Sequence, residues 1–159
     1  MINLYPSVFT GADTTPQYSP GQLAQDSVYG YIYKYVLIHA SSTAASAGRL
    51  FYNTATWNTV SDDYTGGAGL PEQPAGVAVG VIAASSYGWI MVEGYYSDVL
   101  KKTGAITIGD FLQGCSTDGK VVTRTGLTYT AAIAAGTIGI AGETVTAAIT
   151  TVSALIRCN

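Results

Sequence analysis

The residues best suited to chemistry in this chain are the adjacent carboxylates Asp62 and Asp63. Acid–base catalysis by two carboxylates needs side chains that converge from separate elements and differ in pKa, whereas neighbours in a strand or loop point apart. A calcium loop needs Asp or Asn at alternating positions and a terminal Glu, and the residues after Asp63 lack that pattern. We therefore interpret the pair as part of a solvated loop.

The remaining reactive side chains are few. His39 is the only histidine and lies in an apparent strand, and no Gly-x-Ser-x-Gly motif occurs, so no hydroxyl has a candidate base. Cys115 and Cys158 have neither metal-ligand spacing nor a CxxC motif. We expect both to be small buried residues, and a disulfide between them stays open. The sequence thus predicts a protein that is not an enzyme, with no catalytic residue, metal site or cofactor.

A ladder of tyrosines offers a different kind of chemistry. Tyrosine recurs at every second position from Tyr29 to Tyr35, which indicates a strand with aromatic rings on one face. Such rings can stack on sugars or bases. However, no cluster of acidic or amide residues accompanies the ladder to bind ligand hydroxyls, and we interpret it mainly as the wall of a core or an interface.

Composition favours a component of a larger assembly. Only 11% of the 159 residues are charged, against about 25% in an average protein, and such a surface can be approached by other proteins at little desolvation cost. The seven basic residues are scattered and the net charge is −3, so we expect no nucleic-acid partner.

The densest apolar stretch spans residues 75–95, and no charge falls between Glu72 and Glu93. A membrane span has about this length, but the polar segment 85–88 interrupts the run, and we expect no membrane partner. The chain start lacks a charged region followed by an apolar one, so we expect synthesis and use without export. We predict a β-hairpin with strands at 77–82 and 87–93, and Trp89 as the anchor of the core.

Residues 1–27 differ from the rest because Pro6, Pro16 and Pro20 interrupt them and no apolar period starts before Val28. They predict an extended N-terminal arm, either laid over a neighbouring subunit or loose. Residues 28–159 predict a single compact all-β domain, a barrel or sandwich of jelly-roll-like form. A faint self-similarity pairs residues 47–51 with 108–112, and 76–80 with 137–141, at one offset of 61 residues; it suggests two similar β units around one core.

The order of these pieces resembles the head decoration, or capsid cement, proteins of tailed bacteriophages. After an arm rich in Pro and Gly come YIYKYVLIHA (31–40), Ala47-Gly48, Pro-Ala-Gly-Val-Ala (74–78), Tyr-Gly-Trp-Ile-x-Val (87–92), Gly109-Asp110, Ser-Thr-x-Gly-Lys-Val (116–121) and Gly-Ile-Ala (139–141). The likeness runs in order over about residues 16–141.

The resemblance implies a structural virion protein, made in the host cytoplasm, on the outer surface of an expanded capsid. Its partners would be the major capsid protein and itself, as a homotrimer in preference to a dimer. It would stabilise the shell by bridging neighbouring capsid subunits. The candidate residues for the capsid or oligomer interface are Tyr5, Pro6, Phe9, Pro16, Tyr18, Pro20, Tyr29, Tyr31 and Trp57.

A second hypothesis is a carbohydrate-binding or adhesin-type β module on the virion surface, which would use Trp57 and the tyrosine ladder. The two hypotheses differ in what they expect of the arm. For a cement protein, we expect deletion of residues 1–19 to weaken shell binding more than it lowers the melting temperature.

Overall fold

Strands dominate the computed structural model, which describes residues 1–42, 46–56, 58–63, 73–115, 117–124 and 136–158. The strands are β1 (Ile2–Leu4), β2 (Ala12–Asp13), β3 (Leu23–Asp26), β4 (Ile32–Ile38), β5 (Leu50–Asn53), β6 (Thr59–Ser61), β7 (Pro74–Ala78), β8 (Tyr87–Leu100), β9 (Phe111–Gly114), β10 (Val121–Arg124), β11 (Thr137–Ala141) and β12 (Thr151–Arg157). One short 3-10 helix, η1 (Pro6–Thr10), is the only helix in this described part. The strands form one mixed sheet, which confirms the expected all-β, barrel-like fold.

Five strands in the N-terminal part close into a ring, here called the first ring. β4 pairs with β6 in parallel, β6 with β5, β5 with β7 and β7 with β8. Pairing of β8 with β4 then completes the ring. Side chains that alternate to its inside form one buried cluster, made of Val36, Ile38, Phe51, Val60, Ala75, Ala78, Ile82 and Ile90.

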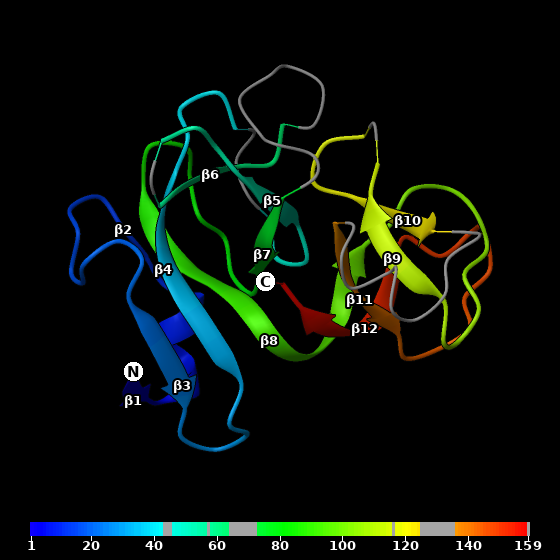
Figure 1. Cartoon of the computed structure of the whole chain (residues 1–159), viewed down its shortest axis with the longest axis horizontal. Coiled ribbons are helices and arrows are strands. Elements are labelled where there is room, and N and C mark those ends of the chain that lie inside the picture. Colours follow the sequence, from blue (N-terminus) through cyan, green and yellow to red (C-terminus); the bar gives the residue numbers. More distant parts are fainter. Residues whose placement is uncertain (43–45, 57, 64–72, 116, 125–135, 159) are drawn as a thin grey trace.

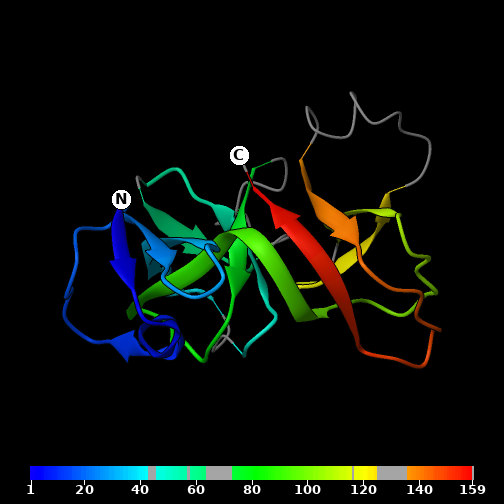
Figure 2. The same ribbon diagram turned by 90° about the horizontal axis from the view of Figure 1, so that it is seen from below.

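The C-terminal strands form a second ring with the same pairing. β8 pairs with β12, β12 with β11, β11 with β9 and β9 with β10. A parallel bridge between Lys101 and Val121 closes it. The amide of Lys102 donates to the carbonyl of Val121 at 2.9 Å, just as His39 donates to Val60 at 2.8 Å in the first ring. In Figures 1 and 2 the long strand β8 crosses the molecule from one ring to the other.

The two rings are structural repeats. The orders β6-β5-β7-β8 and β10-β9-β11-β12 are equivalent, and the second half of β8 takes the place in the second ring that β4 takes in the first. Gly48 and Gly109, at the 61-residue offset, both precede the equivalent strands β5 and β9, with φ of 83° and 88°. The self-similarity of 47–51 and 108–112 therefore corresponds to an arrangement in space. The second pair of segments is shifted, because the register makes Gly76 equivalent to Gly139 and not to Thr137. Two repeated rings are a more specific topology than the jelly-roll-like form that the sequence suggested.

The apolar stretch at 75–95 does contain an antiparallel pair, in which Val77 lies opposite Met91 and Ala78 opposite Ile90. The first strand ends at Ala78, earlier than predicted, and residues 79–86 connect it to β8. Ile82 in this connection is fully buried in the first ring, so the connection closes one end of the ring instead of forming a tight four-residue turn.

Residues 1–27 were expected to form an extended arm, and the structure instead places β1, η1, β2 and β3 there. β3 pairs with β4 and β1 pairs with β3, so this segment extends the sheet. Phe9 is only 1% exposed; its ring stacks on Tyr33 with centroids 3.8 Å apart and meets Trp89 edge-on at 5.6 Å. An arm that buries an aromatic side chain in this way is part of the domain core.

The aromatic cluster behind Phe9 explains why this segment is held. Tyr33, Tyr35 and Trp89 are all buried, at 5%, 0% and 1% exposure. Tyr35 and Trp89 lie opposite each other on β4 and β8, with ring centroids 5.0 Å apart. The inner half of the tyrosine ladder is therefore a wall of the core, and Trp89 lies at its centre.

Replacement of Phe9 by Ala tests this packing. We expect Phe9→Ala to lower the free energy of unfolding by about 3–5 kcal/mol, because it removes a buried aromatic ring and leaves a cavity. Urea denaturation measures the loss. Tyr5→Ala, at a side chain 75% exposed, is the matched control and should change little. A loss for Phe9→Ala as small as that for the control would show that the segment is a loose arm.

Candidate functional site

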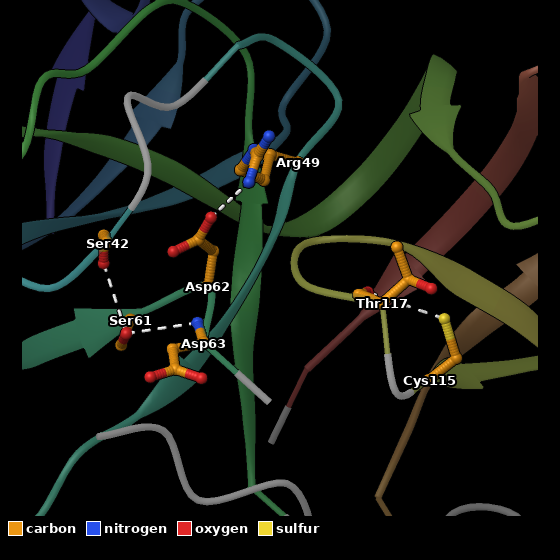
Figure 3. Close-up of polar contacts among 7 residues, drawn as sticks. All are labelled: Ser42, Arg49, Ser61, Asp62, Asp63, Cys115 and Thr117. Carbon is orange, nitrogen blue, oxygen red and sulfur yellow. Dashed lines mark hydrogen bonds and ion pairs between the residues drawn. The ribbon is translucent and has the colours of Figure 1, made fainter. Parts of the chain in front are cut away.

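The paired carboxylates Asp62 and Asp63 do not form a common site. Asp62 is 1% exposed and forms an ion pair with Arg49, so the expectation of a solvated loop is wrong for this residue. Asp63 points the other way, and its amide donates to the hydroxyl of Ser61 at 3.2 Å, as Figure 3 shows. Ser61 also accepts a hydrogen bond from Ser42 at 3.2 Å. The pair is therefore unsuited to acid–base chemistry between its own carboxylates.

The ion pair between Arg49 and Asp62 lies where the two rings meet. The amide of Gly119 in the second ring donates to the carbonyl of Asp62 at 3.0 Å, and the amide of Leu50 donates to the carbonyl of Gly119 at 2.9 Å. Gly119 has φ of 67°, and a Cβ there would lie 2.2 Å from Cγ of Arg49. The close approach of Arg49 needs a glycine at this position, so the second ring packs directly on this ion pair of the first ring.

His39 lies next to a hydroxyl, which the sequence did not predict. The Oγ of Ser41 is 2.7 Å from Nδ1 of His39, and the same nitrogen accepts the amide of Ser41 at 3.2 Å. Both contacts come from a residue two positions along, a local side chain–backbone pattern of turns. Nδ1 of His39 therefore accepts within a local turn, and this geometry does not form a catalytic pair.

Both cysteines are free thiols in this structure. Cys115 is buried, and its sulfur lies 3.6 Å from the carbonyl of Thr117 and 3.5 Å from that of Lys120. Burial raises the pKa of Cys158 to about 12, so this thiol is protonated and weakly nucleophilic at neutral pH. The part of the chain that the structure describes holds no group of three or more His, Cys, Asp or Glu residues able to bind a metal ion.

A cleft of about 480 Å³ opens at one end of the first ring. Lys34, Asn53 and Asn58 supply its polar lining, with Ala75 and Val92 among the apolar part. Burial lowers the pKa of Lys34. The amide of Asn58 donates to the carbonyl of Pro20 at 2.8 Å. One cation and two amides could bind a small polar ligand here.

The predicted interface residues fall into two groups. Tyr5, Pro16, Pro20 and Tyr29 are exposed, with Tyr5 at 75% and Tyr29 at 67%. Pro6, Tyr18 and Tyr31 are half-buried and Phe9 is buried. Trp57 lies outside the described residues. The structure thus leaves the first group accessible and places Phe9 in the core, while Tyr18 meets Tyr35 and Trp89 edge-on with centroids 5.3 and 5.0 Å away.

Sequence reasoning missed exposed apolar residues on the second ring. Tyr95 and Leu155 lie opposite each other on β8 and β12 and are 45% and 54% exposed. Their equivalents in the first ring are the buried residues Tyr33 and Met91, which also lie opposite each other. The strand pairing, and not the 61-residue offset of the sequence, aligns these covered positions with the uncovered ones.

Among the residues described, no helix is long and apolar enough to cross a membrane. No model of a known protein family matches this chain, and no curated protein matches its sequence.

Alkaline pH tests the buried contact between Tyr35 and Asp13. The hydroxyl of Tyr35 donates to Oδ2 of Asp13 at 2.6 Å, and burial together with this hydrogen bond raises the pKa of Tyr35 to about 12. Above the ordinary tyrosine pKa of 10.0, the unfolded chain has released this proton while the folded chain keeps it. Because the folded state then binds more protons, the free energy of unfolding falls as pH rises from about 10 to about 12.

Urea denaturation at a series of pH values measures this slope. Tyr35→Phe should remove part of the slope, whereas Tyr5→Phe, at an exposed ring, should leave it unchanged. Equal slopes for the natural chain and Tyr35→Phe would contradict the assignment of the raised pKa to Tyr35.

The ion pair of Arg49 and Asp62 at the contact between the rings gives another test. Arg49→Met leaves the buried carboxylate of Asp62 without its cation, and we expect a loss of about 3–5 kcal/mol in the free energy of unfolding. Arg124→Met is the matched control, since Arg124 is half-buried and forms no ion pair with a described residue. A double-mutant cycle with Asp62→Leu should show coupling of about 1 kcal/mol or more; additive losses would show that the pair does not act as one unit.

Proposed function

We propose that this chain is a structural virion protein that binds the exterior of an expanded phage capsid and bridges neighbouring major capsid proteins. The observation that carries the proposal is the ordered set of motifs between residues 16 and 141, with Tyr-Gly-Trp at 87–89 near its centre. The all-β fold and the low fraction of charged residues are compatible with this role. We propose a homotrimer as its assembled form, on the outer surface of the particle.

The physical role follows from mass action. A protein that binds only the assembled shell shifts the equilibrium between assembled and separated subunits towards the assembled state. Many weak contacts repeated around a symmetric shell give a high total affinity without a strong single site. Exposed aromatic residues such as Tyr5 and Tyr29 can supply such contacts, because rings bury a large area at little cost in conformational entropy.

A carbohydrate-binding module is the second candidate, and the cleft beside Lys34 is the observation that favours it. The amides of Asn53 and Asn58 line that cleft and could bind sugar hydroxyls. Intrinsic tryptophan fluorescence distinguishes the candidates: a lectin should respond to members of a glycan panel, and a cement protein should give no response.

Addition of the purified chain to undecorated expanded heads tests the first candidate. We expect the chain to sediment with the heads and to raise the temperature at which they rupture, because binding stabilises the assembled state. Unexpanded heads provide the control and should bind less. If the chain stays in the supernatant and the rupture temperature is unchanged, the proposed function is wrong.

A further inference from the structure

The repeat of the two rings reveals one outer face that is buried and an equivalent face on which two large apolar side chains are exposed. In the first ring a row of directly opposed residues crosses the outer face. Because opposed residues share a face of a sheet, the row is continuous, and all its members are at most 5% exposed. The row consists of Ala24, Tyr33, Met91, Val77 and Leu50.

The N-terminal segment supplies part of that cover. β3 pairs with β4 and contributes Ala24 to the row, and Phe9 of η1 stacks on Tyr33. Residues 1–26 therefore do two things for the first ring: they complete an edge of its sheet and they place an aromatic ring on its outer face.

Among the described residues, no segment covers Tyr95 and Leu155 of the equivalent row in the second ring in this way. This row runs across β8, β12, β11, β9 and β10, again through directly opposed residues. Tyr95 and Leu155 are 45% and 54% exposed, and the other members are half-buried. The row consists of Tyr95, Leu155, Ile140, Phe111 and Arg124, and we call it the second-ring row.

The neighbouring edge of β8 also lacks a pairing strand among the described residues, and the Tyr31 side chain packs against Gly94 at the start of this edge. In the first ring, β3 and β6 lie along the edge of β4 that β8 does not occupy. In the second ring, the Lys101–Val121 bridge takes the place of the β4–β6 pair. Within the described ranges, however, no strand takes the place of β3 along residues 94–97 of β8. An unpaired edge beside an apolar face can accept an added strand.

We propose that the second ring binds an extended segment of another polypeptide, which pairs with residues 94–97 of β8 and packs a large apolar side chain on Tyr95 and Leu155. Residues 1–26 on the first ring are the template for this mode of binding. The major capsid protein would supply this segment. Its identity as the partner rests on the proposed function.

Local differences between the rings define the chemistry of the segment. A Cβ at Gly80 would lie 2.4 Å from the carbonyl of Thr10, so the first ring admits the 3-10 turn of η1 only because glycine stands there. Glu143 takes this position in the second ring, and its carboxylate accepts the amide and hydroxyl of Ser153, each at 2.7 Å. The bound segment is therefore extended, without a turn at this point.

Charge adds a second requirement. Arg124 ends the second-ring row, and the exposed Arg157 lies two residues after Leu155, on the same face of β12. Neither forms an ion pair with a described residue. Acidic residues flanking the apolar anchor would complement these two cations.

Hydrogen–deuterium exchange of the full chain tests the proposal in two arms. One arm adds undecorated expanded heads, and the other adds an excess of a synthetic peptide with the sequence of residues 20–28, which hold the extended strand β3 without η1. We expect slower exchange at residues 94–97 in both arms, because the amides of an open edge become hydrogen-bonded when a strand is added.

Substitutions sharpen the first arm. Leu155→Ser and Tyr95→Ser should each lower the affinity for heads roughly tenfold, since each removes an apolar contact of moderate size. Val81→Ser is the matched control, because Val81 is 66% exposed in a loop of the first ring, and it should bind as the natural chain does.

The outcomes separate this inference from the proposed function. Binding to heads with unchanged exchange at 94–97 would keep the function and overturn the inference. No binding to heads, together with protection by the peptide, would overturn the function and keep the inference. No protection in either arm would overturn the inference. Protection that increases with the concentration of the chain alone would identify a second copy as the occupant, and would also overturn it.

Discussion

The length of strand β8 is the constraint on which the structure depends. Its first half pairs with β4 and its second half with β12, so one strand of 14 residues belongs to both rings. Each ring buries its own interior, and neither can close without β8. A chain that forms repeated units around a common strand gains a continuous core, because the units then pack against each other as well as on themselves.

The rings differ in what surrounds them more than in how they are built. The chain has one N-terminal segment, and this segment covers the first ring through β3, η1 and Phe9. The second ring presents Tyr95 and Leu155 at its surface. A large apolar side chain at a surface has an unfavourable contact with water, so a pair of them beside an open strand edge indicates a place for a partner. The two rings are built alike, but only one of them is covered by the N-terminal segment. This difference gives a physical reason why the second ring would bind a partner and the first would not.

Local signals in the sequence predicted local features well. Alternating β-branched and aromatic residues located β4 and β8, and the uncharged run of 75–95 contained the antiparallel pair of β7 and β8. The N-terminal segment was misjudged because a single buried ring, Phe9, holds it, and one residue produces no periodic pattern. Pro6 at the first position of η1 was the available signal of a helix start. The burial of Asp62 depends on Arg49 and on Gly119 in the other ring, and such non-local contacts leave no trace in neighbouring residues. The candidate interface on the second ring could not be predicted from the sequence. It emerges only when residues of the two rings are matched by their strand pairing.

A cryo-EM map of decorated expanded heads tests the central claim most directly, namely that this is a two-ring shell-binding protein whose uncovered ring faces its partner. The account predicts density in which the outer face of β8 and β12 contacts the shell, with an added strand along residues 94–97. Density in which the shell contacts only the first ring and its N-terminal segment, or no density for the chain on the heads, would contradict it.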